Sequence, residues 1–224
     1  MRKQSGFTLI EIAIVLVIIG LLLGGVLKGQ ELITSARVRN LIAQQDGVKA
    51  AYFGFLDRYR ALPGDYSTAQ ATANIPGCGG CFGGDANGQI QTVAESIHAW
   101  EHLSKAGFIT GSYVSGAAAP AAADTTNTPT NPYGSLVQLI FDGVYREGAA
   151  DAGPVRTNLK TGSGIPSDIL AEMDRKVDDG LAATGQLRHS VFGATPSVFA
   201  NCTGAGGVWL ATTSFANCGA ASIF

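Results

Sequence analysis

The chain opens with MRKQSGFTLIEIAIVLVIIGLLL (residues 1–23), in which a short basic leader runs into a long apolar stretch. Between Phe7 and Leu27 the only charged side chain is Glu11. A helix over this range rises about 1.5 Å per residue and therefore spans roughly the 30 Å hydrocarbon core of a bilayer. The stretch predicts a membrane-spanning helix that carries one carboxylate.

The charges before the apolar stretch predict its orientation. Arg2 and Lys3 precede it, and basic residues favour the cytoplasmic side of the membrane. A secretory signal peptide has a shorter apolar core and an A-x-A-like cleavage site, whereas here a helical pattern continues through Lys28-Gly29-Gln30-Glu31. The simplest interpretation is a single-pass anchor, with the rest of the chain outside the cytoplasm.

Glu11 is the residue that a plain anchor does not explain. An ionisable side chain at membrane depth is costly and is commonly functional. A buried carboxylate needs a cation as its partner or becomes protonated. The alternative for Glu11 is a side chain that snorkels to the membrane surface.

The segment Gly6-Phe7-Thr8-Leu9-Ile10-Glu11 resembles the processing signature of the type IV pilin superfamily, G-F-T-L-[IV]-E before an apolar helix. The resemblance implies that a prepilin peptidase cuts between Gly6 and Phe7, which removes a leader of residues 1–6 and leaves Phe7 as the N-methylated first residue. It implies an inner-membrane precursor that an inner-membrane assembly platform incorporates, with homologous subunits, into a periplasmic or extracellular filament. There, the nearest cation for Glu11 is a neighbouring subunit's amino terminus, and the pair would fix the register between subunits.

One helix is predicted over residues 7–62, because no proline occurs between Phe7 and Leu62. Residues 7–27 are apolar on every side, whereas later apolar residues recur at steps of three and four, which predicts one face packed on a globular head at residues 63–224. Gly24-Gly25 is the weak point of the helix. Many major pilins carry a helix-breaking proline that is missing here, which leaves the type of subunit open.

The head is predicted to be pilin-like and α+β, with an antiparallel β-sheet and additional short helices. Helices are expected at Val93–Ala106 and from Pro166 to Val177, the second with Ser167 as a cap and a Glu172/Lys176 pair. The expected strands are Ser135–Phe141, Gly143–Tyr145, Gln186–Val191 and Val208–Thr213. The expected loops are Thr68–Gly88 and Gly111–Asn131, the second of them exposed and mobile.

Four cysteines, Cys78, Cys81, Cys202 and Cys218, lie outside the membrane in this topology. Disulfides are the default there, and the local pairings 78–81 and 202–218 are favoured among three connectivities. The second pairing resembles the disulfide-bounded loop near the carboxyl terminus of many pilins. A zinc site or a redox centre at Cys78-Gly-Gly-Cys81 is the alternative.

Two loops offer hard oxygen ligands, so Asp85, Asn87, Asp178 and Asp179 are weak candidates for calcium. Neither loop has the spaced acids of an EF-hand, and ordinary turns are favoured. His98 and His102 share a helix face at a spacing that suits a metal, but the zincin pattern and a third ligand are missing. We therefore expect no cofactor.

The remaining composition limits the possible functions. A net charge of −2, with 14% charged residues, argues against a broad nucleic-acid-binding surface. The sequence has no G-x-S-x-G motif, phosphate-binding loop or paired catalytic carboxylates, so we do not expect an enzyme. We predict a structural subunit of a type IV pilus-like or type II secretion-like filament, with a minor pilin or pseudopilin favoured over a bulk subunit. The alternative is a membrane-anchored adhesive or ligand-binding domain.

Overall fold

The computed structural model describes residues 8–120, 122–148, 150 and 152–224. The chain consists of two compact units, Met1–Arg37 and Val38–Phe224. The predicted leader (residues 1–6) and the predicted new amino terminus, Phe7, lie outside the described residues.

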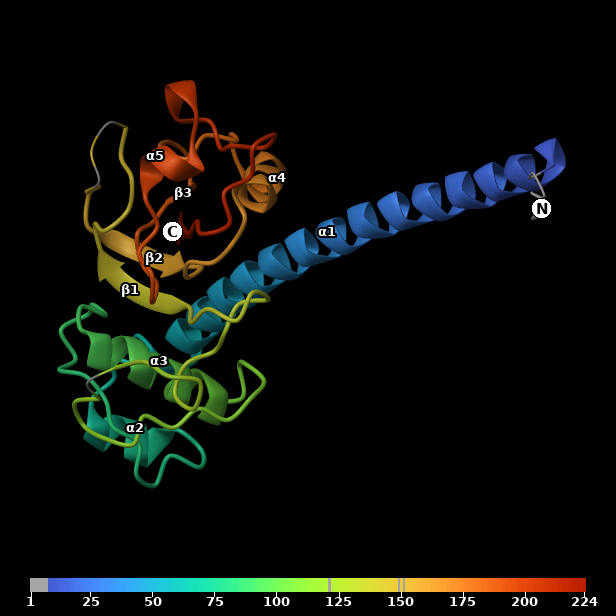
Figure 1. Cartoon of the computed structure of the whole chain (residues 1–224). Helices are drawn as coiled ribbons and strands as arrows, with labels where there is room; N and C mark the ends of the chain where they lie inside the picture. Colours follow the sequence, from blue (N-terminus) through green and yellow to red (C-terminus); the bar gives the residue numbers. More distant parts are fainter. Residues whose placement is uncertain (1–7, 121, 149, 151) are drawn as a thin grey trace. The chain divides into compact units, whose positions relative to one another are not determined.

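The first unit is helical. Helix α1 (Leu9–Tyr59) begins in this unit and continues into the second (Figure 1). It passes through Gly24-Gly25 without a break, and no described side chain before Val38 is buried. By its length and composition, the apolar part of α1 could cross a membrane.

Helix α1 ends at Tyr59, three residues before the predicted end at residue 62. Arg60 takes a left-handed φ of 54°, and its N–H still donates to the carbonyl of Leu56. Pro63 disfavours helical geometry at the residue before it. The helix therefore closes ahead of the proline.

The second unit holds a four-stranded antiparallel sheet in the order β1-β2-β4-β3. In the register, Leu139 lies opposite Leu159, which in turn lies opposite Ser222. The predicted α+β class is confirmed, because a long apolar helix is combined with a small antiparallel sheet and short helices. The strands are β1 (Gln138–Asp142), β2 (Arg156–Lys160), β3 (Leu187–His189) and β4 (Ala220–Ile223).

Several strand predictions need correction. The two central strands, β2 and β4, are absent from the predicted set. The predicted strand Val208–Thr213 forms only isolated bridges, at Val208 to Leu181 and at Trp209 to Thr203. The predicted strand Gly143–Tyr145 is instead a turn, because the carbonyl of Gly143 accepts the N–H of Tyr145.

The helix predictions agree with the structure better than the strand predictions do. Helix α3 starts with a capping box, in which Thr92 and Glu95 each accept the other's backbone N–H. Ser167 is not the cap predicted for α4, because Pro166 occupies the cap position and the Ser167 hydroxyl accepts the N–H of Phe215 instead. The predicted Glu172–Lys176 pair is confirmed. The short helices are α2 (Thr68–Asn74), α3 (Val93–Lys105), α4 (Ser167–Val177), α5 (Phe199–Cys202) and the 3-10 helix η1 (Ala205–Gly207).

The loop predictions are partly wrong. Helix α2 lies inside the expected loop Thr68–Gly88, and the Ser67 hydroxyl accepts the N–H of Gln70 to cap it. The expected loop Gly111–Asn131 is not exposed throughout, since it contains the buried side chains of Ser115, Asn127, Thr128 and Asn131. Hydrogen bonds hold these polar groups, so part of the loop is fixed to the head.

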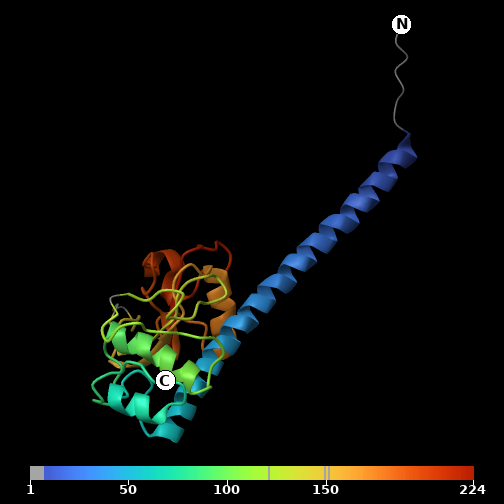
Figure 2. The same ribbon diagram turned by 90° about the horizontal axis from the view of Figure 1, so that it is seen from below.

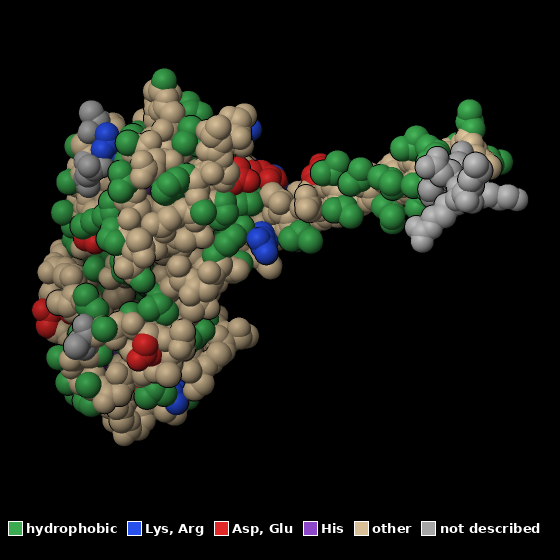
Figure 3. All heavy atoms as spheres, in the orientation of Figure 1, with side chains coloured by type: hydrophobic (Ala, Val, Ile, Leu, Met, Phe, Trp, Pro, Cys, Tyr) green, Lys and Arg blue, Asp and Glu red, His purple; other side chains and the backbone are tan. Residues whose placement is uncertain are grey.

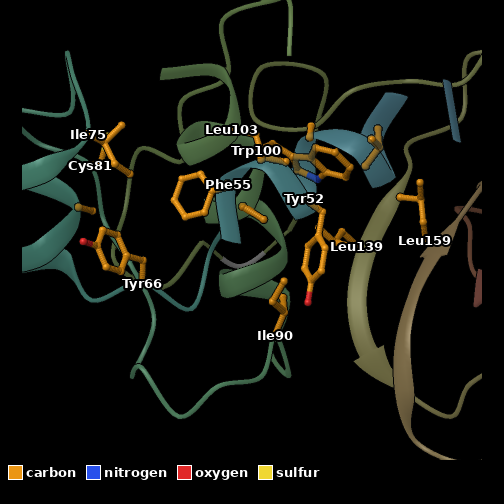
Figure 4. Close-up of a cluster of buried hydrophobic side chains, with 14 of the residues drawn as sticks. Tyr52, Phe55, Tyr66, Ile75, Cys81, Ile90, Trp100, Leu103, Leu139 and Leu159 are labelled. Atoms are coloured by element: carbon orange, nitrogen blue, oxygen red, sulfur yellow. The ribbon is translucent and has the colours of Figure 1, made fainter. Parts of the chain in front are cut away.

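Two large clusters of buried apolar side chains fill the second unit. One lies toward α2 and α3, where Phe55 of α1 packs with Trp100 and Leu103 of α3 (Figure 4). The other lies toward α4 and α5 and joins Leu41 of α1 to Leu170 and Trp209. Figures 1 and 2 show these two groups of helices at opposite ends of the unit. Both clusters therefore include side chains from α1.

Candidate functional site

The first candidate site is the exposed apolar surface of the first unit. Leu9 is 89% exposed and Leu21 is 73% exposed, and hydrophobic side chains cover this part of the helix in Figure 3. Exposed apolar area costs about 25 cal/mol per Å² relative to burial, so this surface requires apolar surroundings. Its large members are Leu9, Ile10, Ile12, Ile14, Val15, Leu16, Val17, Ile18, Ile19, Leu21, Leu22, Leu23, Val26, Leu27, Leu32 and Ile33.

Glu11 lies in the first turn of α1, where Thr8 holds it. Glu11 Oε2 accepts the backbone N–H of Thr8 at 2.7 Å and the Thr8 hydroxyl at 2.6 Å. The backbone contact is one half of a capping box, which needs Ser or Thr three residues before Glu. This role of Thr8 was not predicted, although the spacing Thr8-x-x-Glu11 is the signal that indicates it.

The other predicted processing residues, Gly6 and Phe7, lie outside the described residues. The cleavage position and the pairing of Glu11 with a neighbour's amino terminus therefore stay predictions.

The cysteines form two disulfides in the second unit. Cys78 joins Cys81 with their Cα atoms 4.9 Å apart, and Cys202 joins Cys218 with theirs 5.8 Å apart. All four cysteines are buried and each belongs to one of these bonds. In this state the C-x-x-C segment offers no thiolate for zinc, and the two bonds brace loops of the head.

Backbone groups of the head are the hydrogen-bond partners of His98 and His102. His102 is fully buried, with Nδ1 accepting the N–H of Gly64 at 3.0 Å and Nε2 lying 2.8 Å from the carbonyl of Phe82. Burial lowers the pKa of His102 to about 4. His98 Nε2 contacts the carbonyl of Ala118 at 3.2 Å. Because both ring nitrogens of His102 are engaged, the pair does not form a metal site.

Two groups of acids bring ligand atoms close together among the described residues. The first consists of Asp65, Asp85 and Glu95, with ligand oxygens within 4.8 Å of one another. Backbone N–H groups of Asn87 and Gly88 donate to Asp65. Burial raises the pKa of the Asp65 carboxyl, while these donors lower it.

Asn87, a predicted ligand, serves its own turn. Its side-chain oxygen accepts the N–H of Gln89, and its Nδ2 donates to Asp85. Asp85 thus keeps its place beside candidate ligands, whereas Asn87 has its side-chain oxygen engaged.

The second group consists of Asp174, Asp178 and Asp179, again with ligand oxygens within 4.8 Å of one another. It contains both acids predicted from Asp178-Asp179-Gly180 and adds Asp174 from α4. Asp174 was not predicted as a candidate ligand. Its signal was the spacing of four and five residues before the other two acids, which places them at one helix end.

A cavity of about 380 Å³ lies beside α3 in the second unit. Its lining includes Ile97, Leu136 and Phe192 with the hydroxyls of Ser96 and Thr128. The lining residues include no acid, base or thiol among the described part of the chain. The described lining therefore offers serine and threonine hydroxyls but no side chain that could serve as a general acid or base beside them.

Comparison with known proteins identifies the start of the chain. Residues 1–27 match the family model described as the prokaryotic N-terminal methylation motif. The matched range contains Gly6, Phe7 and Glu11 and the apolar part of α1. No curated protein and no solved structure matches the chain.

Proposed function

We propose that this chain, which carries the type IV prepilin signature at residues 1–27, is a structural subunit of a pilus-like or type II secretion-like filament. Within that class we assign it to the minor pilins or pseudopilins rather than to the bulk subunits. It is made as a single-pass inner-membrane precursor and then enters a periplasmic or extracellular filament. The observation that carries the proposal is the methylation motif leading into a helix whose large apolar side chains are exposed.

The exposed helix needs two successive apolar environments under this proposal. In the precursor, the hydrocarbon core of the membrane surrounds residues 7–27. In the filament, the helices of neighbouring subunits replace the lipid and bury the same surface. The inner-membrane assembly platform transfers the helix from one environment to the other.

Glu11 supplies the specific contact between subunits. Thr8 occupies Oε2, while no described residue donates a hydrogen bond to Oε1. After the prepilin peptidase cuts between Gly6 and Phe7, each subunit has a new N-methylated amino terminus at Phe7. We assign Oε1 of Glu11 to the amino terminus of a neighbour, because a buried ion pair can select one register among the many that an apolar helix surface allows.

Two features of the head support a non-catalytic role. Its cysteines are in disulfides, and its buried His102 is held by backbone groups. The proposed partners are the prepilin peptidase, the assembly platform and homologous subunits.

Mass spectrometry of the amino terminus tests the processing step in membrane and sheared-filament fractions. We expect an N-methylated Phe7 in both fractions. An uncut terminus, or a cut after an A-x-A-like site, would contradict the proposal. The amount in the sheared fraction also separates the roles, because a bulk subunit dominates that fraction and a minor subunit does not.

The variant Glu11→Ala tests the pairing. We expect normal membrane insertion but incorporation into filaments reduced to less than about a tenth, because an amino terminus left unpaired in an apolar core costs several kcal/mol. Glu31→Ala is the matched control, since Glu31 lies on the same helix, is exposed and pairs with Lys28 at 2.6 Å. Normal incorporation of the Glu11 variant would refute the pairing. If the chain is instead an anchored binding domain, Glu11→Ala leaves surface display and ligand binding intact.

A further inference from the structure

The carboxyl end of α4 collects three acids around one small volume. Asp174 lies in the last turn of the helix, and Asp178 and Asp179 follow its end. One carboxylate oxygen from each lies within 4.8 Å of the others. Two oxygens that bind one Ca²⁺ at about 2.4 Å are at most about 4.8 Å apart. The three carboxylates are therefore close enough to share one ion.

A buried oxygen without a partner gives an independent indication of a ligand. Asp174 is 0% exposed. Its Oδ2 accepts the indole N–H of Trp209 at 2.7 Å. Its Oδ1 is buried and has no partner in hydrogen-bond geometry, although the backbone N–H of Gly180 lies near the carboxylate. Leaving a buried carboxylate oxygen unsatisfied is costly, so Asp174 Oδ1 requires a cation or a proton.

The position at the end of the helix increases that requirement. The carboxyl end of a helix carries a partial negative charge and unsatisfied carbonyls, which favour cations and disfavour acids. The described ion pairs of the chain all use acids other than these three. Lys49 attracts Asp178 electrostatically, but it forms none of these ion pairs and so does not occupy the place of a bound ion.

Asp178 and Asp179 accept hydrogen bonds from the turn that follows α4. Asp178 Oδ2 accepts the N–H of Leu187 at 3.0 Å. Asp179 Oδ1 accepts the N–H of Leu181 at 2.8 Å, and its Oδ2 accepts the Thr184 hydroxyl at 2.6 Å. These bonds hold both carboxylates beside Asp174 without using Asp174 Oδ1. Asp178 Oδ1 has no donor among the described residues, while each oxygen of Asp179 accepts one hydrogen bond and would bind an ion through its remaining lone pair.

We propose that Asp174, Asp178 and Asp179 bind one Ca²⁺ at the carboxyl end of α4. The ligands are hard oxygens, and the helix end adds backbone carbonyls, a set that suits Ca²⁺ and excludes soft metals. Mg²⁺ fits less well, because it demands near-ideal octahedral geometry, whereas these carboxylates come from neighbouring residues of one turn. The ion joins α4 to the turn at residues 178–187 and, through Asp174, to Trp209. Affinity in the range of extracellular modules, a dissociation constant of about 10⁻⁴ to 10⁻³ M, is expected.

Trp209 provides a direct assay. Its indole nitrogen contacts Asp174, so excitation of tryptophan should transfer energy to Tb³⁺, which replaces Ca²⁺ at oxygen sites. We would titrate Tb³⁺ into the full chain, held in detergent micelles and stripped of metal with a chelator, and then displace it with Ca²⁺. Sensitised luminescence that Ca²⁺ reverses is the expected result.

Two matched variants locate the ion. Asp179→Asn keeps the local bonds, because its amide oxygen can accept from Leu181 and its amide nitrogen can donate to Thr184. We expect it to fold but to weaken Tb³⁺ and Ca²⁺ binding at least about tenfold. Asp85→Asn removes an acid from the other acidic group, in which no buried orphan oxygen is found among the described residues, and should leave the signal unchanged.

Thermal unfolding gives a second measurement. Saturating Ca²⁺ should raise the melting temperature of the wild-type chain and of Asp85→Asn, but not that of Asp179→Asn, because only a ligand that prefers the folded state stabilises it. The proposal is overturned if Tb³⁺ gives no sensitised signal, if Asp179→Asn binds as tightly as the wild type, or if Asp85→Asn alone abolishes binding.

Discussion

His102 makes the stability of the head depend on pH, and the variant His102→Gln tests this dependence. The N–H of Gly64 points at Nδ1, so Nδ1 carries no proton and Nε2 donates to the carbonyl of Phe82. Protonation would place a second donor against the N–H of Gly64 in a fully buried position. Burial is the main reason that the pKa of His102 falls to about 4, and the nearby His98 lowers it further.

The sign and size of the effect follow from this pKa. In the unfolded chain His102 titrates near 6.5, so between about pH 6.5 and pH 4 the unfolded state binds a proton that the folded state does not. The stabilisation that neutral His102 contributes is therefore complete above about pH 6.5 and is lost as the pH falls toward 4. Each pK unit corresponds to about 1.4 kcal/mol, so the loss across this window is about 3 kcal/mol.

Urea unfolding of the full chain in detergent micelles measures the effect at several values between about pH 4 and pH 7. Glutamine can accept from Gly64 and donate to Phe82, as neutral histidine does, but it cannot gain a proton. Asp65 and Asp174 have raised pKa values and act in the opposite direction, yet they are common to both proteins and cancel in the difference. We expect the wild type to lose about 3 kcal/mol more than the variant over this range. Equal pH dependence of the two proteins would refute the argument.

Two further predictions concern packing and backbone geometry. Phe55→Ala should lower the free energy of unfolding by about 3–5 kcal/mol, because Phe55 is fully buried. Phe53→Ala, at a side chain 52% exposed, should lower it by less than half as much. Urea unfolding of both variants checks this, and similar losses would contradict it. Gly64→Ala should cost at least about 2 kcal/mol, since Gly64 has a φ of +86° and a Cβ there would overlap the Glu95 carbonyl. Gly77→Ala, at a similar φ of +74° but with a Cβ that would meet only Lys105 Cδ at an ordinary 3.9 Å, isolates the backbone strain of about 1–2 kcal/mol. Equal melting temperatures of the two glycine variants would show that the overlap does not matter.

The first unit was predictable because its surface needs no partner from the rest of the chain. An unbroken apolar run indicates a membrane-spanning helix by composition alone, and the methylation motif lies within a few consecutive residues. Helix α3 was predictable for a similar reason, since the capping residues Thr92 and Glu95 and its apolar stripe are local. Such features can be recognised without knowing the tertiary structure.

The two central strands depend on distant partners and so were missed. In β2 the alternating pattern is hidden, because Asn158 and Lys160 are buried polar residues. Lys160 is tolerated there because it pairs with Asp142 of the adjacent strand, a contact between residues far apart in sequence. Strand β4 consists mostly of small residues, which have weak strand propensity, and its place between β2 and β3 is set by pairing alone.

Asp174 was missed as a ligand for the same physical reason. As one acid in an amphipathic helix, it suggests a solvent-facing position, and only the tertiary fold brings Trp209 against it. That indole donates to one oxygen of Asp174, while the other oxygen is buried without a partner in hydrogen-bond geometry. A chemically demanding position of this kind arises from packing, so a pattern within one segment cannot reveal it.

Helix α1 has a role in the second unit that neither its motif nor its apolar start predicts. Val38 and Leu41 pack in the cluster with α4 and Trp209, whereas Val48 and Phe55 pack in the cluster with α3. The same helix therefore contributes to both cores, and loosening either core removes part of its support. A bound ion at the end of α4 would strengthen the cluster that contains Val38 and Leu41.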